Sequence, residues 1–82
     1  MKNEFKQMLG KHIRRRRQEL NMTLEELADK SQIDEKHLGR IERGEKLPNA
    51  FTLTSLQSAL KLSSDVYMPE FEELCKKYSQ EE

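Results

Sequence analysis

The sequence predicts an all-α protein. Apolar residues recur every three or four positions along most of its 82 residues, which is the period of an amphipathic helix. No stretch alternates between apolar and polar residues for long, as a strand with one buried face would. Residue types that begin and end helices interrupt the pattern at short intervals. We therefore expect five short helices in a single small domain.

The first two predicted helices lie in the first third of the chain. One runs from about Asn3 to Leu20. The next begins after Thr23, an N-cap residue, and Glu26 three positions later completes a capping box. The apolar residues expected to face the core are Phe5, Leu9, Ile13 and Leu20 in the first helix and Leu24, Leu27 and Ala28 in the second.

The other three predicted helices are delimited in the same way. Asp34 is a good N-cap for the third, and Gly44 stands where a left-handed C-terminal cap is needed, with Pro48 just beyond. The fourth begins near Asn49, and Pro69 fits the first position of the fifth. The residues expected inside are Leu38 and Ile41 in the third helix, Phe51, Leu53, Leu56, Ala59 and Leu60 in the fourth, and Phe71, Leu74, Cys75 and Tyr78 in the fifth.

Composition excludes several classes of protein. Cys75 is the only cysteine, so no intramolecular disulfide can form, and a reducing cytoplasm is the simplest interpretation. No apolar run approaches the roughly 18 residues that a membrane span needs, and the N-terminus lacks the apolar segment of a secretion signal. His12, His37 and Cys75 have no metal-ligand spacing, and no nucleophile motif or glycine-rich phosphate loop is present. We expect no enzymatic activity, metal, cofactor or small-molecule ligand.

The zero net charge hides an asymmetry between the two halves of the chain. Residues 1–46 carry 12 Lys and Arg against 9 Asp and Glu, whereas residues 47–82 carry 3 against 6. A cationic front half and an anionic back half suit a protein that presents one face to a polyanion. Ordinary mixed surface charge explains the totals equally well.

Two short helices joined by a tight turn stand in the middle of the chain. The predicted second helix, the break at Ser31 to Ile33 and the predicted third helix have the helix-turn-helix arrangement, in which the second helix of the pair enters the DNA major groove. The segment from Leu9 to Leu60 resembles the phage-repressor/Cro-type (XRE-type) helix-turn-helix family. Its most specific parts are TLEELA and LGRIERGEKLPN, and the second is similar to the family signature small-x-Ile-Glu-Arg-Gly followed by Pro.

The resemblance implies a compact, five-helix, lambda-repressor-like fold, with the helix-turn-helix DNA-binding domain in residues 1–63. Residues 64–82 then form a turn and a short amphipathic helix that serves packing or dimerisation. The implied function is a sequence-specific, double-stranded DNA-binding transcriptional regulator, either a repressor or a controller-type autoregulator. Because one recognition helix reads only a few base pairs, we expect a homodimer on a palindromic operator.

The predicted third helix carries the residues expected to read bases. If Leu38 and Ile41 face inward, Lys36, Arg40 and Arg43 fall on the opposite side. Lysine and arginine both donate to guanine O6 and N7, and a glutamate accepts from the cytosine amino group. Glu35 is equally explained as a helix-dipole carboxylate, and His37 as an exposed histidine without function. The predicted base-contacting residues are Glu35, Lys36, His37, Gly39 and Arg40.

Gly39 is unexpected in the middle of a helix, where glycine costs roughly 1 kcal/mol relative to alanine. One interpretation is that the missing side chain lets the helix lie deeper in the groove. The other is that the glycine has no role.

Phosphate contacts are expected around the recognition helix. The backbone N–H groups at the start of the second helix can face a phosphate. Relatives commonly have Gln at position 24, and Leu24 cannot make the polar contacts of that side chain. The predicted phosphate-contacting residues are Lys11, Arg14, Arg15, Thr23, Leu24, Glu25, Arg43 and Lys46.

Two further arginines of the Arg14–Arg17 run have structural roles. In the family, an arginine at position 17 pairs with the glutamate of the signature, so the resemblance implies an Arg17–Glu42 ion pair between the first and third helices. Arg16 stands where relatives often have Leu, so its stem is expected to cover the core while its head reaches water or phosphate.

The C-terminal part of the chain supplies the expected dimer surface. Its candidate residues are Phe51, Tyr67, Phe71, Leu74 and Tyr78. A different interpretation remains open, in which the fold is a protein-interaction module such as an antitoxin or anti-repressor. In that case the acidic C-terminal helix binds a partner protein.

Overall fold

The computed structural model describes residues 1–80, and within them the chain folds into α-helices and one short 3-10 helix. The elements are α1 (Lys2–Glu19), α2 (Leu24–Ser31), α3 (Glu35–Glu42), α4 (Ala50–Leu60), η1 (Ser64–Val66) and α5 (Met68–Gln80). The all-α fold with five α-helices is therefore confirmed over the described residues. Residues 81 and 82, the end of the predicted C-terminal extension, lie outside them.

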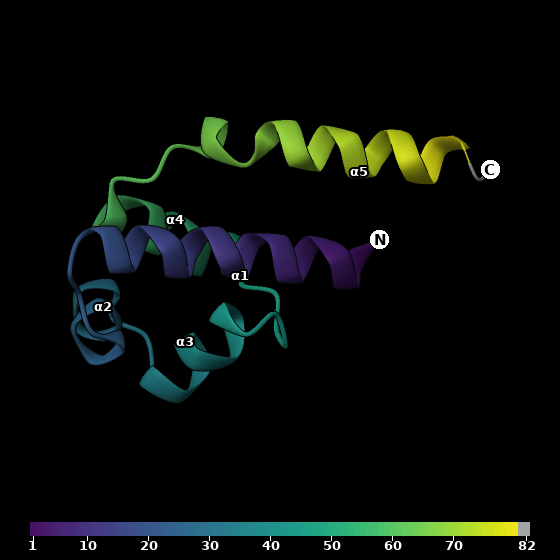
Figure 1. The fold of residues 1–82 in the computed structure, drawn as a ribbon. Helices are drawn as coiled ribbons and strands as arrows, with labels where there is room; N and C mark the ends of the chain where they lie inside the picture. Colours follow the sequence, from purple (N-terminus) through teal and green to yellow (C-terminus); the bar gives the residue numbers. More distant parts are fainter. Residues whose placement is uncertain (81–82) are drawn as a thin grey trace.

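The helices are arranged around α1, which runs along the length of the molecule (Figure 1). The α2–α3 pair lies on one side of α1 and α5 on the opposite side, with α4 behind. The molecule measures 42 × 21 × 20 Å along its principal axes. This arrangement leaves the outer surface of α3 facing away from α5.

Side-chain caps fix where the three middle α-helices begin. The Thr23 hydroxyl accepts from the Glu26 N–H at 3.1 Å, and the Glu26 carboxylate accepts from the Thr23 N–H at 2.9 Å. Asp34 accepts from the His37 N–H at 3.1 Å at the start of α3, and Asn49 caps α4 in the same way. These caps confirm the capping box and the N-cap predicted for Asp34.

The turn between α2 and α3 is closed without glycine. Gln32 ends α2 with a left-handed φ of 56°, and the Ile33 N–H donates to the Ala28 carbonyl at 3.0 Å. At the end of α3, Gly44 has a φ of 75°, as the sequence predicts. The tight Gln32 turn sets α3 across α2 and directs its outer side to solvent.

The core lies where α1, α2, α3 and α4 meet. Leu9, Ile13, Leu27, Leu38, Ile41, Leu56 and Leu60 are each less than 2% exposed. Two inward predictions are wrong, because Phe51 is 77% exposed and Leu20 is 36% exposed. Leu20 is the C-cap residue just after α1, and Phe51 belongs to the first turn of α4, at the edge of the packed layer.

The C-terminal helix packs on α1 rather than standing free. The rings of Phe5 and Phe71 meet edge to face with centroids 5.3 Å apart, and Lys77 pairs with Glu4 at 3.2 Å. Phe71 and Leu74 are half-buried against the core, whereas Tyr67, just before α5, is buried in it. Pro69 is the second residue of α5, which begins at Met68, one residue earlier than predicted.

Candidate nucleic-acid interface

The two sides of α3 have opposite environments. Leu38 and Ile41 are at most 1% exposed and pack in the core. Lys36 and Arg40 lie on the exposed surface of the same helix, together with Glu35. The helix therefore presents two long cationic donors to solvent from a rigid support, which is the arrangement expected of a helix that reads a DNA groove.

The Arg17–Glu42 pair holds the inner side of α3. Arg17 Nε donates to Glu42 Oε2 at 2.8 Å and its Nη2 donates to Oε1 at 3.0 Å, so the pair is bidentate. Arg17 Nη1 also donates to the Met22 carbonyl at 2.8 Å, so the same side chain contacts the turn after α1. The hydrogen bond that Arg17 donates to Glu42 raises the pKa of Arg17 above its ordinary value. The ion pair implied by the resemblance is confirmed.

A glycine that the sequence reading did not single out brings α1 close to α3. A Cβ built on Gly10 would lie 2.7 Å from the Glu42 carbonyl oxygen and in contact with that of Ile41. Real Cβ atoms essentially never come that near to backbone oxygens. Gly10 therefore lets the two backbones touch. The signal was present, because Gly10 interrupts a strong helical pattern between Leu9 and Ile13.

Gly39 is buried, which corrects the expectation that it contacts a base. A Cβ on this residue would lie 3.6 Å from Leu24 Cδ2 and 3.0 Å from Arg43 Nη1. The side chains of Leu24, from α2, and Arg43 thus cover the Gly39 backbone. A Cβ here would make ordinary contact with Leu24 and meet only the flexible end of Arg43, so the crossing of α2 over α3 does not require the glycine.

The predicted phosphate contacts on α1 lie beside the end of α3. Lys11, Arg14 and Arg15 line a shallow groove of about 330 Å³ together with Arg43. Arg14 and Arg43 continue into a smaller groove of about 240 Å³, whose floor includes Leu24 and Gly39. The fold thus gathers cations from two helices next to the outer side of α3, which favours contact with a polyanion.

The start of α2 is the other predicted phosphate position. The capping box leaves Thr23, Leu24 and Glu25 at the first turn, where backbone N–H groups have no carbonyl partner within the helix. Thr23 and Glu25 are exposed, and Leu24 is half-buried. The hydrogen bond from the Thr23 backbone lowers the pKa of Glu26, so this carboxylate is already engaged in the cap. Lys46, in the loop after α3, is exposed.

Other predicted positions take different roles. Arg16 Nε donates to the Leu60 carbonyl at 2.9 Å, so its head caps the C-terminus of α4 instead of reaching phosphate. Its Nη1 also pairs with Glu19 at 3.3 Å.

His37 is half-buried beside its Asp34 cap. His12, which the sequence reading placed in no site, is 5% exposed and bonds Glu70 at 2.8 Å, joining α1 to α5.

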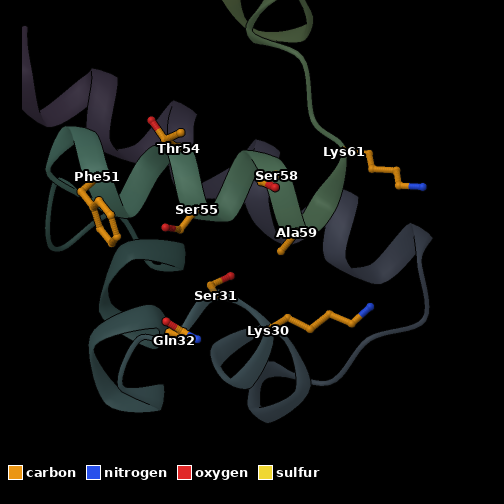
Figure 2. A pocket seen from close by; sticks show the side chains of 9 residues that line it. All are labelled: Lys30, Ser31, Gln32, Phe51, Thr54, Ser55, Ser58, Ala59 and Lys61. Atoms are coloured by element: carbon orange, nitrogen blue, oxygen red, sulfur yellow. The ribbon is translucent and has the colours of Figure 1, made fainter.

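The candidate dimer residues divide into three groups. Tyr67 is 6% exposed, so its side chain belongs to the core, which corrects its place in the dimer surface. Phe71, Leu74 and Tyr78 are half-buried. Phe51 is well exposed at one end of a groove between α2 and α4, with Lys30 and Lys61 at the other end (Figure 2). Phe51 is thus the best-exposed apolar member of the predicted surface.

The described residues show neither a metal site nor a membrane span. Within residues 1–80, no group of three or more histidine, cysteine, aspartate or glutamate side chains is placed to hold a metal ion. None of the helices in that part of the chain combines the length and the apolar composition that a membrane crossing requires.

The fold and the exposed second helix of the α2–α3 pair define a helix-turn-helix protein. The sequence profile of a family described as helix-turn-helix matches residues 13–67. The chain belongs to this helix-turn-helix family.

Relatives and a solved structure agree with this assignment. Two uncharacterized HTH-type transcriptional regulators from two strains of Mycobacterium tuberculosis are 32% identical over 57 residues, which is 70% of this chain. The match spans only 41% of the length of each relative. The crystal structure of the clp gene regulator ClgR from Corynebacterium glutamicum is similar, with a TM-score of 0.74 and 31% identity. That similarity covers 93% of this chain and 82% of the other.

Proposed function

We propose that the protein is a sequence-specific, double-stranded DNA-binding transcriptional regulator that inserts α3 into the major groove. One observation supports this most directly. Lys36 and Arg40 are exposed on α3, while Leu38 and Ile41 of the same helix are buried. Both side chains are donors suited to guanine O6 and N7, and Arg40 offers the better two-point geometry. Glu35 and His37 complete the proposed reading surface, with Glu35 accepting from a cytosine amino group.

The grip on the DNA backbone comes from the cations beside α3. Lys11, Arg14, Arg15 and Arg43 surround one groove, so they can meet phosphates on one flank of the recognition helix. The first-turn N–H groups of α2 supply a second contact on the other flank. This division assigns affinity to α1 and α2 and sequence preference to α3.

We further propose a homodimer on a palindromic operator, acting as a repressor or controller-type autoregulator. An 8-residue recognition helix contacts few base pairs, so a second copy on a half-site one turn away supplies the missing affinity. Phe51 is the side chain that most needs a partner, since it is 77% exposed. The half-buried residues Phe71, Leu74 and Tyr78 of α5 offer less exposed apolar surface.

The alternative of a partner-binding module through α5 is less well supported. A docking helix needs a free apolar side, whereas the apolar side of α5 packs against Phe5 and the core. Antitoxin or anti-repressor activity through α5 therefore requires the helix to leave α1.

Selection of bound sequences from a random duplex pool tests the proposed function. The selected duplex is then titrated with wild type, Lys36→Ala and Arg40→Ala, with Lys76→Ala on α5 as the charge-matched control. We expect Arg40→Ala to cost about 1–3 kcal/mol of binding free energy and to relax preference at one position. Sedimentation measures the oligomeric state of the protein with and without the duplex. A folded wild-type protein that enriches no sequence contradicts the proposal.

A further inference from the structure

A carboxylate lies against the arginines at the end of the recognition helix. Glu45 Oε2 accepts from Arg43 Nε at 2.7 Å, and its Oε1 lies 3.9 Å from Arg40 Nε. The three side chains are 50–58% exposed, so water and other ions reach all of them. The proposed function assigns both arginines to DNA, one to a base and one to a phosphate. Glu45 therefore occupies the position that an anionic oxygen of DNA would take in the proposed complex.

The backbone explains why the carboxylate lies there. Gly44 turns the chain with a φ of 75°, and the Glu45 N–H donates to the Arg40 carbonyl at 2.9 Å. The Gly44 N–H also donates to the Ile41 carbonyl at 3.1 Å. Glu45 is thus anchored by the C-terminal cap of α3, one turn from Arg40 and next to Arg43. Its position follows from the way the helix ends.

The chemistry of the contact matches that of a phosphate contact. Arginine binds carboxylate and phosphate through the same directed N–H donors. The Arg43 hydrogen bond lowers the pKa of Glu45, and the Glu45 carboxylate raises the pKa of Arg43. Glu45 is therefore ionised near neutral pH, and it engages Arg43 in the absence of DNA.

We propose that Glu45 is an internal competitor for DNA phosphate, which lowers the affinity of this interface for DNA of any sequence. The inference rests on the proposed function. To contact a phosphate, Arg43 exchanges its carboxylate partner for a phosphate oxygen, so the loss of the Glu45 contact offsets part of what the phosphate contact contributes. Base contacts by Lys36 and Arg40 are made only with a matching sequence. Glu45 thus sets the level of non-specific binding without reading bases.

The test compares Glu45→Gln with Glu73→Gln in the full chain. Both changes remove one negative charge from an exposed ion pair, but Glu73 pairs with Lys76 on α5 at 3.8 Å. α5 lies across α1 from α3 (Figure 1). Anisotropy titrations with the selected duplex and a scrambled duplex, between 50 and 200 mM salt, give the affinity and its salt slope. Circular dichroism melts verify that both variants are folded.

We expect Glu45→Gln to bind both duplexes more tightly, by about five- to tenfold near 0.1 M salt for each recognition helix engaged. The salt slope should steepen by about 0.9, because one more counterion is released per helix. Glu73→Gln should change either affinity less than twofold. In an Arg43→Gln background the gain from Glu45→Gln should vanish, since the exchange acts through Arg43.

The outcomes separate the inference from the function beneath it. If the wild type binds DNA but Glu45→Gln binds no more tightly than Glu73→Gln, the inference is overturned and the proposed function stands. A gain that persists with Arg43→Gln also overturns the exchange, because general repulsion would then explain it. If neither the wild type nor Glu45→Gln binds any duplex, the proposed function fails as well.

Discussion

The inner and outer sides of α3 are built from the same kinds of residue with opposite results. Each side carries an arginine–glutamate pair with a 2.8 or 2.7 Å contact, Arg17–Glu42 inside and Arg43–Glu45 outside. The inner side chains are 14% and 5% exposed, the outer ones 58% and 50%. The inner side also meets Gly10 of α1, whereas Gly39 of α3 itself is covered by the side chains of Leu24 and Arg43.

Burial decides what each pair does. Losing one partner of a buried ion pair strongly destabilises a protein, because the other partner is left as an uncompensated charge. An exposed pair is solvated in every state, so either partner can be exchanged for another ion. The inner pair therefore holds α3 in place, whereas the arginine of the outer pair can exchange its glutamate for another anion.

The largest expected effect is that of Arg17→Ala. This change leaves Glu42 buried without its cation, and we expect the free energy of unfolding to fall by about 3 kcal/mol. Urea denaturation followed by circular dichroism measures the loss. Arg14→Ala, an exposed arginine on the same helix, is the matched control and should cost little. Equal midpoints for the two variants would contradict the structural role of the pair.

Gly10→Ala comes next. The added Cβ meets the Glu42 carbonyl oxygen at 2.7 Å, so α1 and α3 have to move apart. We expect a loss of about 1–3 kcal/mol, as for other overpacked contacts. Because the shift displaces α3, duplex binding should weaken beyond what unfolding explains. A thermal melt and a titration at a temperature where the variant is folded separate the two effects.

Gly39→Ala should act in the opposite direction. Its Cβ meets only the mobile end of Arg43 at 3.0 Å and makes ordinary contact with Leu24. Alanine is the better helix former, so the variant should gain up to about 1 kcal/mol of stability. The same urea experiment measures it. A loss of stability comparable with that of Gly10→Ala would show that α2 and α3 are packed as tightly as α1 and α3.

The smallest stability effect is expected for Glu45→Gln. The pKa of Glu45 is lowered by Arg43, so any stabilisation it gives is present above its unfolded-state pKa and is lost as pH falls through the folded-state pKa. Wild type and variant should therefore melt at the same temperature at acidic pH and differ only slightly at neutral pH and low salt. Added salt should remove that difference. A neutral-pH difference that persists at high salt would contradict the solvated character of the pair.

Local signals in the sequence predict the ends of the helices well. Thr23, Glu26 and Asp34 cap through bonds to residues three positions away, and Gly44 adopts its left-handed φ within one turn. The Arg17–Glu42 pair spans 25 positions, and only the resemblance to a family implied it.

Features that depend on how helices cross are not accessible in the same way. The helical wheel of α3 alone puts Gly39 at the edge of the exposed side, and its burial follows from Leu24 lying across it. His12 and Glu70 are 58 positions apart in the sequence, and nothing about either residue type predicts that they are in contact. Phe51 is exposed although helical spacing predicted it inside, and Tyr67 is buried although it was predicted on the dimer surface, because helical spacing does not say which side of α4 has a neighbour or where the residue after η1 packs.

The contact at Gly10 has a consequence for how new binding preferences arise. The angle of α3 is set against carbonyl groups of Ile41 and Glu42, which are backbone atoms and do not change when side chains are substituted. Positions 35, 36 and 40 can therefore vary without altering the docking geometry of the helix. Under the proposed function, a change of target sequence therefore leaves the architecture intact, and exchanging those three side chains is the simplest way to redirect binding.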